Sequence, residues 1–156
     1  MADKVPSSFE LGRMFFHYAR KSRDLTRYGV LSDLFRQAWS IDTASPGCQP
    51  TWTPANPAFG QCAVTALCLH DMCGGTIVRC NVEGFGSHYF NHLSNGEGYS
   101  VYDLTRTQFP SGTVVPPGQL VERPYILESP RAIEFRTPQR YDLLKEALAA
   151  AMRKAG

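Results

Sequence analysis

The segment from residue 60 to residue 75 reads GQCAVTALCLHDMCGG and decides most of the predicted fold. Between Ala63 and Met72 only three residues are polar, so apolar side chains would cover most of the circumference of a helix. Such a helix belongs in the centre of a fold. We expect it to start near Gln61 and to stop at Gly74-Gly75, because glycine often ends helices.

Further helices are predicted on both sides of this segment. Each combines apolar residues at helical spacing with a start signal, and for the last helix that signal is Thr137 as N-cap with Pro138 at the first helical position. The second helix should start after Gly29. The proline-rich residues 40–59 should form a loop. These helices are expected over residues 9–23, 30–39 and 141–154.

Three strands should follow the central helix, over residues 76–82, 88–93 and 99–104. Residues 83–86 would turn the first pair, and Asn95-Gly96 would turn the second. Residues 110–124 are expected to be irregular or edge structure. The predicted fold class is α+β, with N-terminal helices, a central buried helix carrying a cysteine, an antiparallel β-sheet and a C-terminal helix. At 156 residues the chain is most simply a single domain, 1–156.

The hairpin around Asn95-Gly96 brings a histidine and a carboxylate together. If these two residues form a two-residue turn, Ser94 pairs with Glu97 and His88 lies directly opposite Asp103. Directly opposed side chains are within reach of a hydrogen bond. A four-residue loop would make the pair diagonal but keep it on the same face. A three-residue loop or a bulge would separate the two residues onto opposite faces.

Cys62, His88 and Asp103 then form the parts of a nucleophilic cysteine site. The positive end of the helix dipole at Cys62 favours the thiolate, and an imidazole nearby would complete the activation. Free backbone N–H groups at the helix start could hold an oxyanion. We expect His88 to act as base and then acid, with Asp103 orienting it.

Three further residues are candidates for the same cleft. Gln61 or Asn56 could donate to the oxyanion, and Trp52 could line the cleft. Other cysteines and histidines are not expected to take part in the chemistry. Cys68, Cys73 and Cys80 should pack in the core, His70 should be a structural or surface residue, and His92 should face the solvent or support His88. No cysteine pair has the spacing of a zinc site, so neither a metal nor a cofactor is expected.

The composition excludes several classes of protein. Hydrophobic residues make up 43% and charged residues 19%, which argues against intrinsic disorder. The net charge of +2 comes from scattered basic residues, so nucleic acid is not an expected partner. No segment has the length of a membrane span or the apolar run of a signal peptide, so no membrane is expected. Five cysteines without a signal peptide favour reduced thiols in the cytoplasm.

The segment Gly60-Gln61-Cys62 resembles the nucleophile motif of transglutaminase-like proteins, within the papain-like superfamily. Those proteins also place the cysteine at a helix start and the histidine and aspartate on adjacent strands. Here 26 residues separate Cys62 from His88, which implies a minimal version of the papain-like or transglutaminase-like core.

A resemblance to the small bacterial YunG-like family covers most of the chain and implies a bacterial or phage origin. It implies no substrate. The residues that carry it are Trp39-Ser40, Asp42-Thr43, residues 56–67, Gly74-Gly75, His88-Tyr89-Phe90-Asn91, Asp103-Leu104-Thr105 and Gln108-Phe109.

The sequence therefore predicts a cysteine-dependent acyl-transfer enzyme of the peptidase, amidase, deamidase or transglutaminase type. Its substrate would be a protein, a peptide or a small amide. One alternative is a non-catalytic binding module that keeps the papain-like fold and its cleft. Another is a structural role, in which the three polar residues only satisfy one another in the core.

Overall fold

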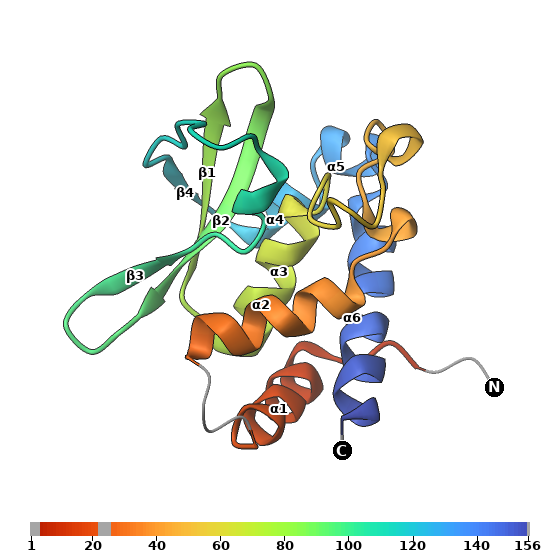
Figure 1. Ribbon diagram of the computed structural model, residues 1–156, viewed down its shortest axis with the longest axis vertical. Coiled ribbons are helices and arrows are strands. Elements are labelled where there is room, and N and C mark those ends of the chain that lie inside the picture. The colour runs from red at the N-terminus through yellow and green to blue at the C-terminus, as the bar shows by residue number, and fades with distance from the viewer. Residues whose placement is uncertain (1–3, 22–25, 156) are drawn as a thin grey trace.

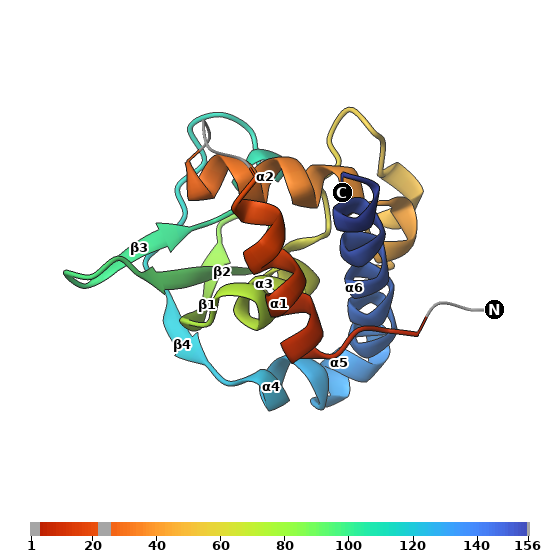
Figure 2. The ribbon, with the colours of Figure 1, turned by 90° about the horizontal axis from the view of Figure 1, so that it is seen from below.

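The computed structural model describes residues 4–21 and 26–155 of the chain. It confirms the predicted α+β class, with helices packed against a four-stranded antiparallel sheet. In Figure 1 the sheet lies on one side, α6 (Thr137–Lys154) on the other, and α3 (Cys62–Cys73) between them. Figure 2 shows α1 (Ser8–Ala19) crossing in front of α3, which it contacts.

The central helix is α3, as predicted. It packs against α1, α6 and the second strand of the sheet. Leu67 and Leu69 are fully buried, and burying a leucine stabilises a fold by about 1.5–3 kcal/mol. The polar Thr65 is accommodated because its hydroxyl accepts a hydrogen bond from the indole Nε1 of Trp39 at 2.8 Å. The buried residues of α3 are Val64, Thr65, Ala66, Leu67, Cys68, Leu69 and Met72.

The two N-terminal helices begin at side-chain caps. The Ser7 hydroxyl accepts a hydrogen bond from the Glu10 N–H at 3.1 Å and starts α1, which ends at Ala19. The expected end near Arg23 lies outside the described residues. Helix α2 (Arg27–Ala38) starts earlier than predicted, because the Thr26 hydroxyl caps it by accepting from the Gly29 N–H at 3.1 Å.

The loop before α3 folds back against the start of that helix. It contains two short 3₁₀ turns, η1 (Ile41–Thr43) and η2 (Gln49–Thr51). Gly60 closes the loop, with φ of 75° and its carbonyl accepting from the Ser45 N–H at 2.9 Å. A Cβ atom at Gly60 would lie 2.7 Å from the Cβ of Cys48, so a larger residue would not fit there.

The strands of the sheet are β1 (Thr76–Val82), β2 (Gly86–Ser94), β3 (Tyr99–Tyr102) and β4 (Gln119–Val121). Their order in the sheet is β3-β2-β1-β4, and each neighbouring pair is antiparallel. The edge strand β4 forms within the segment that the sequence predicts to be irregular or edge structure. One face of the sheet carries a smaller hydrophobic cluster around Val78, Cys80, Val82 and Phe90.

The observed β2–β3 register differs from the register that a two-residue turn at Asn95-Gly96 would produce. Ser94 pairs with Tyr99 rather than with Glu97, so four residues connect the strands. Beyond the ladder, the Asn95 N–H donates to the Gly98 carbonyl at 3.4 Å, which centres the tight turn on Gly96-Glu97. Gly96, with φ of 89°, suits the first central position of such a turn. The four-residue alternative is therefore the one observed, and it keeps His88 and Asp103 on the same face.

The C-terminal third adds two short helices before α6. These are α4 (Arg123–Leu127) and α5 (Pro130–Glu134). The sequence predicts Thr137 as the N-cap of α6, but it is the first helical residue. The position before it is taken by Arg136, with φ of 54°, because only two residues connect α5 to α6. The Thr137 hydroxyl instead accepts from Arg140 Nη2 at 3.3 Å.

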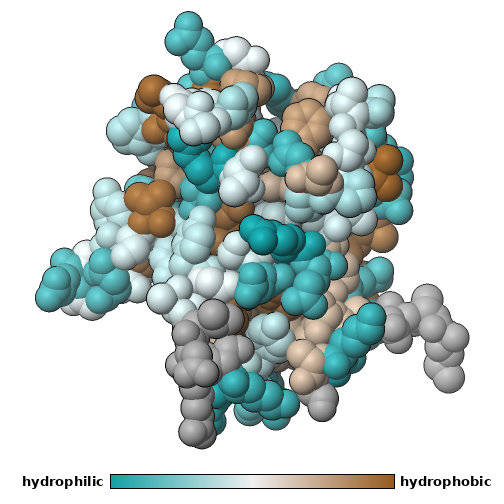
Figure 3. All heavy atoms as spheres, in the orientation of Figure 1, coloured by the Kyte–Doolittle hydropathy of each residue, from teal (hydrophilic) through white to brown (hydrophobic). Residues whose placement is uncertain are grey.

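Across residues 4–21 and 26–155, no helix has both the length and the apolar character needed to cross a bilayer. Hydrophobic and hydrophilic residues are interspersed on the face shown in Figure 3.

Candidate active site

Cys62 is the first residue of α3 and is half-buried. It lines a cavity of about 250 Å³. The N–H groups of Cys62, Ala63 and Val64 find no protein acceptor among the described residues, whereas the Thr65 N–H donates to the Gln61 carbonyl at 3.0 Å. The start of α3 therefore offers both a thiol and free backbone donors at one cavity.

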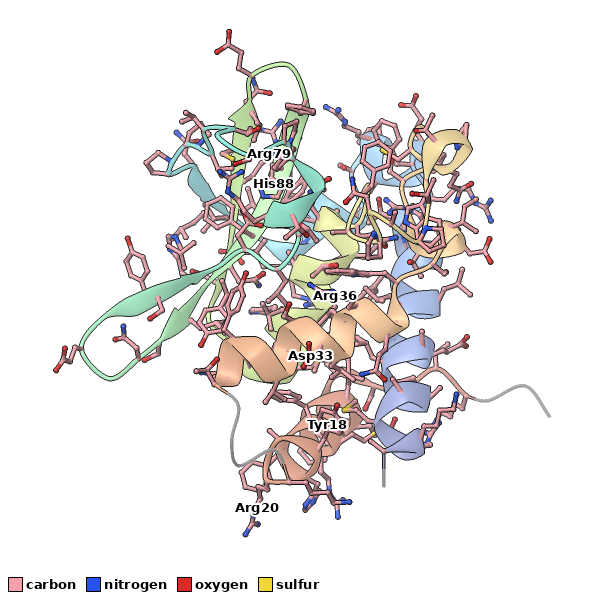
Figure 4. The ribbon with its side chains drawn as sticks, in the orientation of Figure 1. Tyr18, Arg20, Asp33, Arg36, Arg79 and His88 are labelled. Carbon is pink, nitrogen blue, oxygen red and sulfur yellow. The ribbon has the colours of Figure 1, made fainter. Side chains whose placement is uncertain are left out.

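His88 and Asp103 form a buried pair beside this helix start. The His88 Nε2 lies 2.8 Å from the Asp103 Oδ2, and His88 is 0% and Asp103 9% exposed. The ring of Phe109 packs edge-on against the imidazole, with centroids 4.9 Å apart. Figure 4 shows His88 between β2 and the segment carrying η3 (Arg106–Gln108). The imidazole is thus fixed by a carboxylate and an aromatic ring.

The surroundings of His88 favour its charged form. Burial lowers the pKa of His88, but hydrogen bonds to Asp103 and Cys62, with the negative charges of both groups, outweigh burial and raise it to about 9. Since Nε2 faces Asp103, Nδ1 is the ring nitrogen that remains for other partners. Cys62, His88 and Asp103 are therefore brought together, with the imidazole hydrogen-bonded to the carboxylate and the thiol near enough to raise the pKa of His88.

Gln108 is a site residue that sequence reasoning does not single out as functional. Its Nε2 lies 3.5 Å from the His88 Nδ1 and donates to the Thr105 hydroxyl at 3.1 Å. Its Oε1 accepts from the Gly60 N–H at 3.4 Å. Gln108 also lines the cavity with Cys62. The only signal for it in the sequence is its place in the family resemblance, beside Phe109.

Gln61 does not line the Cys62 cavity. The side chain is fully buried and its Nε2 donates to the Ser40 carbonyl at 2.9 Å. Its Oε1 has no hydrogen-bond partner within the described part of the chain. Gln61 thus ties the start of α3 to the loop after α2, and its amide points to that loop.

Asn56 and Trp52 line a different hollow, together with Arg36 and Thr107. The Asn56 Nδ2 donates to the Gln108 carbonyl at 3.4 Å, and the Trp52 Nε1 donates to the Pro57 carbonyl at 3.1 Å. Both contacts stabilise the loop before α3. Asn56 thereby reaches the site indirectly, through the backbone of Gln108.

Aromatic rings and cations dominate the cavity next to Cys62. Cys48 also lines it, and burial, then the negative charge of Cys62, raises the pKa of the Cys48 thiol. The charged residues of the lining are Arg131 and Arg140. The aromatic lining residues are Phe59, Phe85, Tyr89, Phe109, Tyr125 and Phe135.

The remaining cysteines and histidines lie apart from this cavity. Cys68 and Cys80 are buried and Cys73 is half-buried. The His70 Nδ1 lies 3.1 Å from the Arg123 Nη1, and the His92 ring stacks on Tyr99 at 4.1 Å. In the described part of the chain, no group of three histidine, cysteine or acidic side chains could hold a metal ion.

The fold and these residues define an α+β protein with a candidate cysteine–histidine–aspartate site. A family model described as YunG protein matches residues 28–153, so the chain belongs to the YunG family. A curated relative, "Uncharacterized protein YunG" of Bacillus subtilis (strain 168), is 40% identical over 76 residues. The match covers 49% of this chain and only 57% of the relative's length. No solved structure matches the chain significantly.

Proposed function

We propose that this protein is a cysteine-dependent acyl-transfer enzyme in which Cys62 is the nucleophile. The proposal rests on one observation above all. The His88 imidazole is held 2.8 Å from a buried Asp103 carboxylate, and the nearby Cys62 helps to raise the pKa of His88. An imidazolium fixed in this way stabilises a thiolate at neutral pH.

Acylation begins with attack of the Cys62 thiolate on the carbonyl carbon of an amide. A carbon–sulfur bond forms and the carbonyl oxygen becomes an oxyanion. The Cys62 N–H, which has no protein acceptor in the described structure, and the Gln108 amide, which lines the same cavity, are the candidates to hold this oxyanion. When the oxyanion collapses, the carbon–nitrogen bond breaks and the His88 imidazolium gives its proton to the departing amine. The result is a thioester on Cys62 and a neutral His88.

Deacylation reverses these roles. Water gives a proton to His88 while its oxygen attacks the thioester carbon, and collapse expels the Cys62 thiolate and releases a carboxylic acid. An amine in place of water would form a new amide. The first outcome is peptidase, amidase or deamidase chemistry, and the second is transglutaminase chemistry.

We also propose that α3, β2 and β3 are a small version of the papain-like or transglutaminase-like core. The order supports this: the cysteine opens a helix, the histidine lies on the next hairpin and the aspartate directly follows β3. We further place the reaction in a reducing compartment such as the cytoplasm. All five cysteines are free, and a thiolate nucleophile requires the reduced state.

The test uses p-nitrophenyl acetate, an activated ester that acylates reactive thiols. We expect a burst of p-nitrophenolate equal to the enzyme concentration, with the acetyl group located on Cys62 by peptide mass mapping. Cys62→Ala should abolish the burst. Cys48→Ala is the matched control, because Cys48 lines the same cavity but burial raises the pKa of its thiol, and this variant should keep the burst.

A burst that survives in Cys62→Ala, or equal acetylation of Cys48 and Cys62, would contradict the proposal. The cavity would then favour the alternative function, a binding module without catalysis.

A further inference from the structure

The cavity beside Cys62 contains a buried cation. Arg140, on α6, is 5% exposed and lines this cavity. In the described part of the chain no carboxylate pairs with Arg140, whereas Arg123 pairs with Asp71 at 3.0 Å and Lys145 with Asp142 at 3.3 Å. Buried charges in proteins are normally paired or bind a charged ligand. Arg140 therefore stands out from the other basic groups.

Three neutral acceptors fix the Arg140 guanidinium in place. Its Nε donates to the Phe135 carbonyl at 2.9 Å, its Nη1 to the Thr43 carbonyl at 3.1 Å and its Nη2 to the Thr137 hydroxyl at 3.3 Å. A guanidinium has five N–H donors, so one on each terminal nitrogen remains. Two such donors match the two oxygens of a carboxylate.

The other lining residues add to this preference. Arg131 is the second charged residue of the cavity, and no aspartate or glutamate is among the lining residues of the described structure. Burial lowers the pKa of Arg140 to about 10, so the group stays charged at neutral pH. The negative charges of Cys62 and Cys48 oppose the effect of burial, because they raise the pKa of Arg140 and favour its charged form. The cavity thus combines aromatic surface with positive charge.

We propose that this cavity binds substrates that carry a carboxylate next to an aromatic or apolar group, with the Arg140 guanidinium receiving the carboxylate. The chemical step on such a substrate rests on the proposed function of Cys62, but the binding preference does not. A peptide with a free C-terminus and a small aromatic acid share this chemistry.

The experiment measures binding by calorimetry in Cys62→Ala protein, so that no covalent step interferes. Phenylacetate is compared with the neutral phenylacetamide, and acetyl-phenylalanine with its amide. Within each pair the carboxylate should bind at least about tenfold more tightly. A preference confined to the second pair would identify a peptide C-terminus, and one confined to the first a small acid.

Variants assign the preference to a residue. Arg140→Gln should reduce the preference for the carboxylate to about onefold. Arg140→Lys, which keeps the positive charge but lacks the paired N–H donors of the guanidinium, should keep part of the preference. Arg153→Gln, an exposed arginine on the same helix, should leave it unchanged. If Arg140→Gln does not fold, the Nε–Hε resonance of Arg140 in otherwise unchanged protein should shift with phenylacetate and not with phenylacetamide.

Equal binding of acid and amide in both pairs would overturn the inference. The inference would also be overturned if the carboxylate preference persisted in Arg140→Gln or were abolished by Arg131→Gln alone. An Arg140 resonance that does not shift when phenylacetate is added would overturn it as well. These results are separate from a failure of the proposed function. An unreactive Cys62 with an intact preference would leave the binding site in place, and a reactive Cys62 without the preference would remove this inference alone.

Discussion

Asp103 lies diagonally across the hairpin from His88, yet its Oδ2 is 2.8 Å from the His88 Nε2. Strand β3 ends at Tyr102, so Asp103 is the first residue beyond the ladder. The Tyr28 hydroxyl donates to the Asp103 backbone carbonyl at 3.0 Å and holds this residue in position. A diagonal pair outside the regular ladder is therefore as close as a directly opposed one would be.

The His88–Asp103 pair should make stability depend on pH. Because the pKa of His88 is raised to about 9 in the folded protein, the folded protein holds this proton longer than the unfolded chain, where histidine titrates near 6.5. The resulting stabilisation is fully present below pH 6.5 and is lost as pH rises through about 9. Its size is up to about 3 kcal/mol. Urea unfolding at a series of pH values measures it.

Asp103→Asn should weaken this dependence, because the carboxylate that favours the imidazolium is gone. Asp142→Asn, at an exposed carboxylate on α6, is the control and should keep the wild-type slope. Subtracting the pH dependence of unfolding free energy in one variant from that in the other cancels the contributions of the other titrating groups. Identical slopes in both would mean that Asp103 does not stabilise a charged His88.

Gly60 should be intolerant of a side chain. Its φ of 75°, and the 2.7 Å that would separate an added Cβ from the Cys48 Cβ, predict that Gly60→Ala costs more than about 1 kcal/mol of unfolding free energy. Gly47→Ala is the matched control, because a Cβ there meets no atom within 4 Å, and it should change stability by less than about 0.5 kcal/mol. Equal effects in thermal or urea unfolding would contradict the close contact at Gly60.

Replacing glutamine with glutamate should mainly reduce stability at Gln61 and mainly slow acylation at Gln108. Gln61→Glu replaces the donor that faces the Ser40 carbonyl with an oxygen in a fully buried position, and should cost at least about 2 kcal/mol of stability. Gln108→Glu, at the half-buried cavity wall, should cost less. It should instead slow acylation by p-nitrophenyl acetate by about 10²–10³, because it removes the proposed oxyanion donor. Slower acylation in a stable Gln61→Glu variant would make Gln61 the oxyanion donor.

The local sequence predicts the parts of the fold that depend on short-range patterns. The apolar circumference of α3 places it in the core, and glycines end it where expected. The hairpin is predicted from Asn95-Gly96, but its register is not, because a glycine can occupy either central position of a tight turn. The shift of two residues keeps the parity of the strand, which is why His88 and Asp103 still share a face.

The rest of the site depends on contacts between segments far apart in sequence. Gln108 reaches His88 from η3, and Arg140 reaches the cavity from α6, which local periodicity does not reveal. Trp52 and Asn56 precede Cys62 closely in sequence, but the loop turns them into a separate hollow. The short helices α4 and α5 escape prediction because five residues carry too little periodicity to identify a helix.

The most direct test of the central claim is the rate at which iodoacetamide alkylates Cys62 as a function of pH, read at each cysteine by peptide mass mapping. We predict a substantial rate at neutral pH and below, at least about tenfold faster than Cys48, which lines the same cavity. His88→Ala should remove most of this rate at neutral pH, and Asp103→Asn should reduce it less, because Asp103 acts through His88. A Cys62 rate that rises only near pH 8.5, as for an ordinary thiol, and is unchanged in both variants would contradict the account.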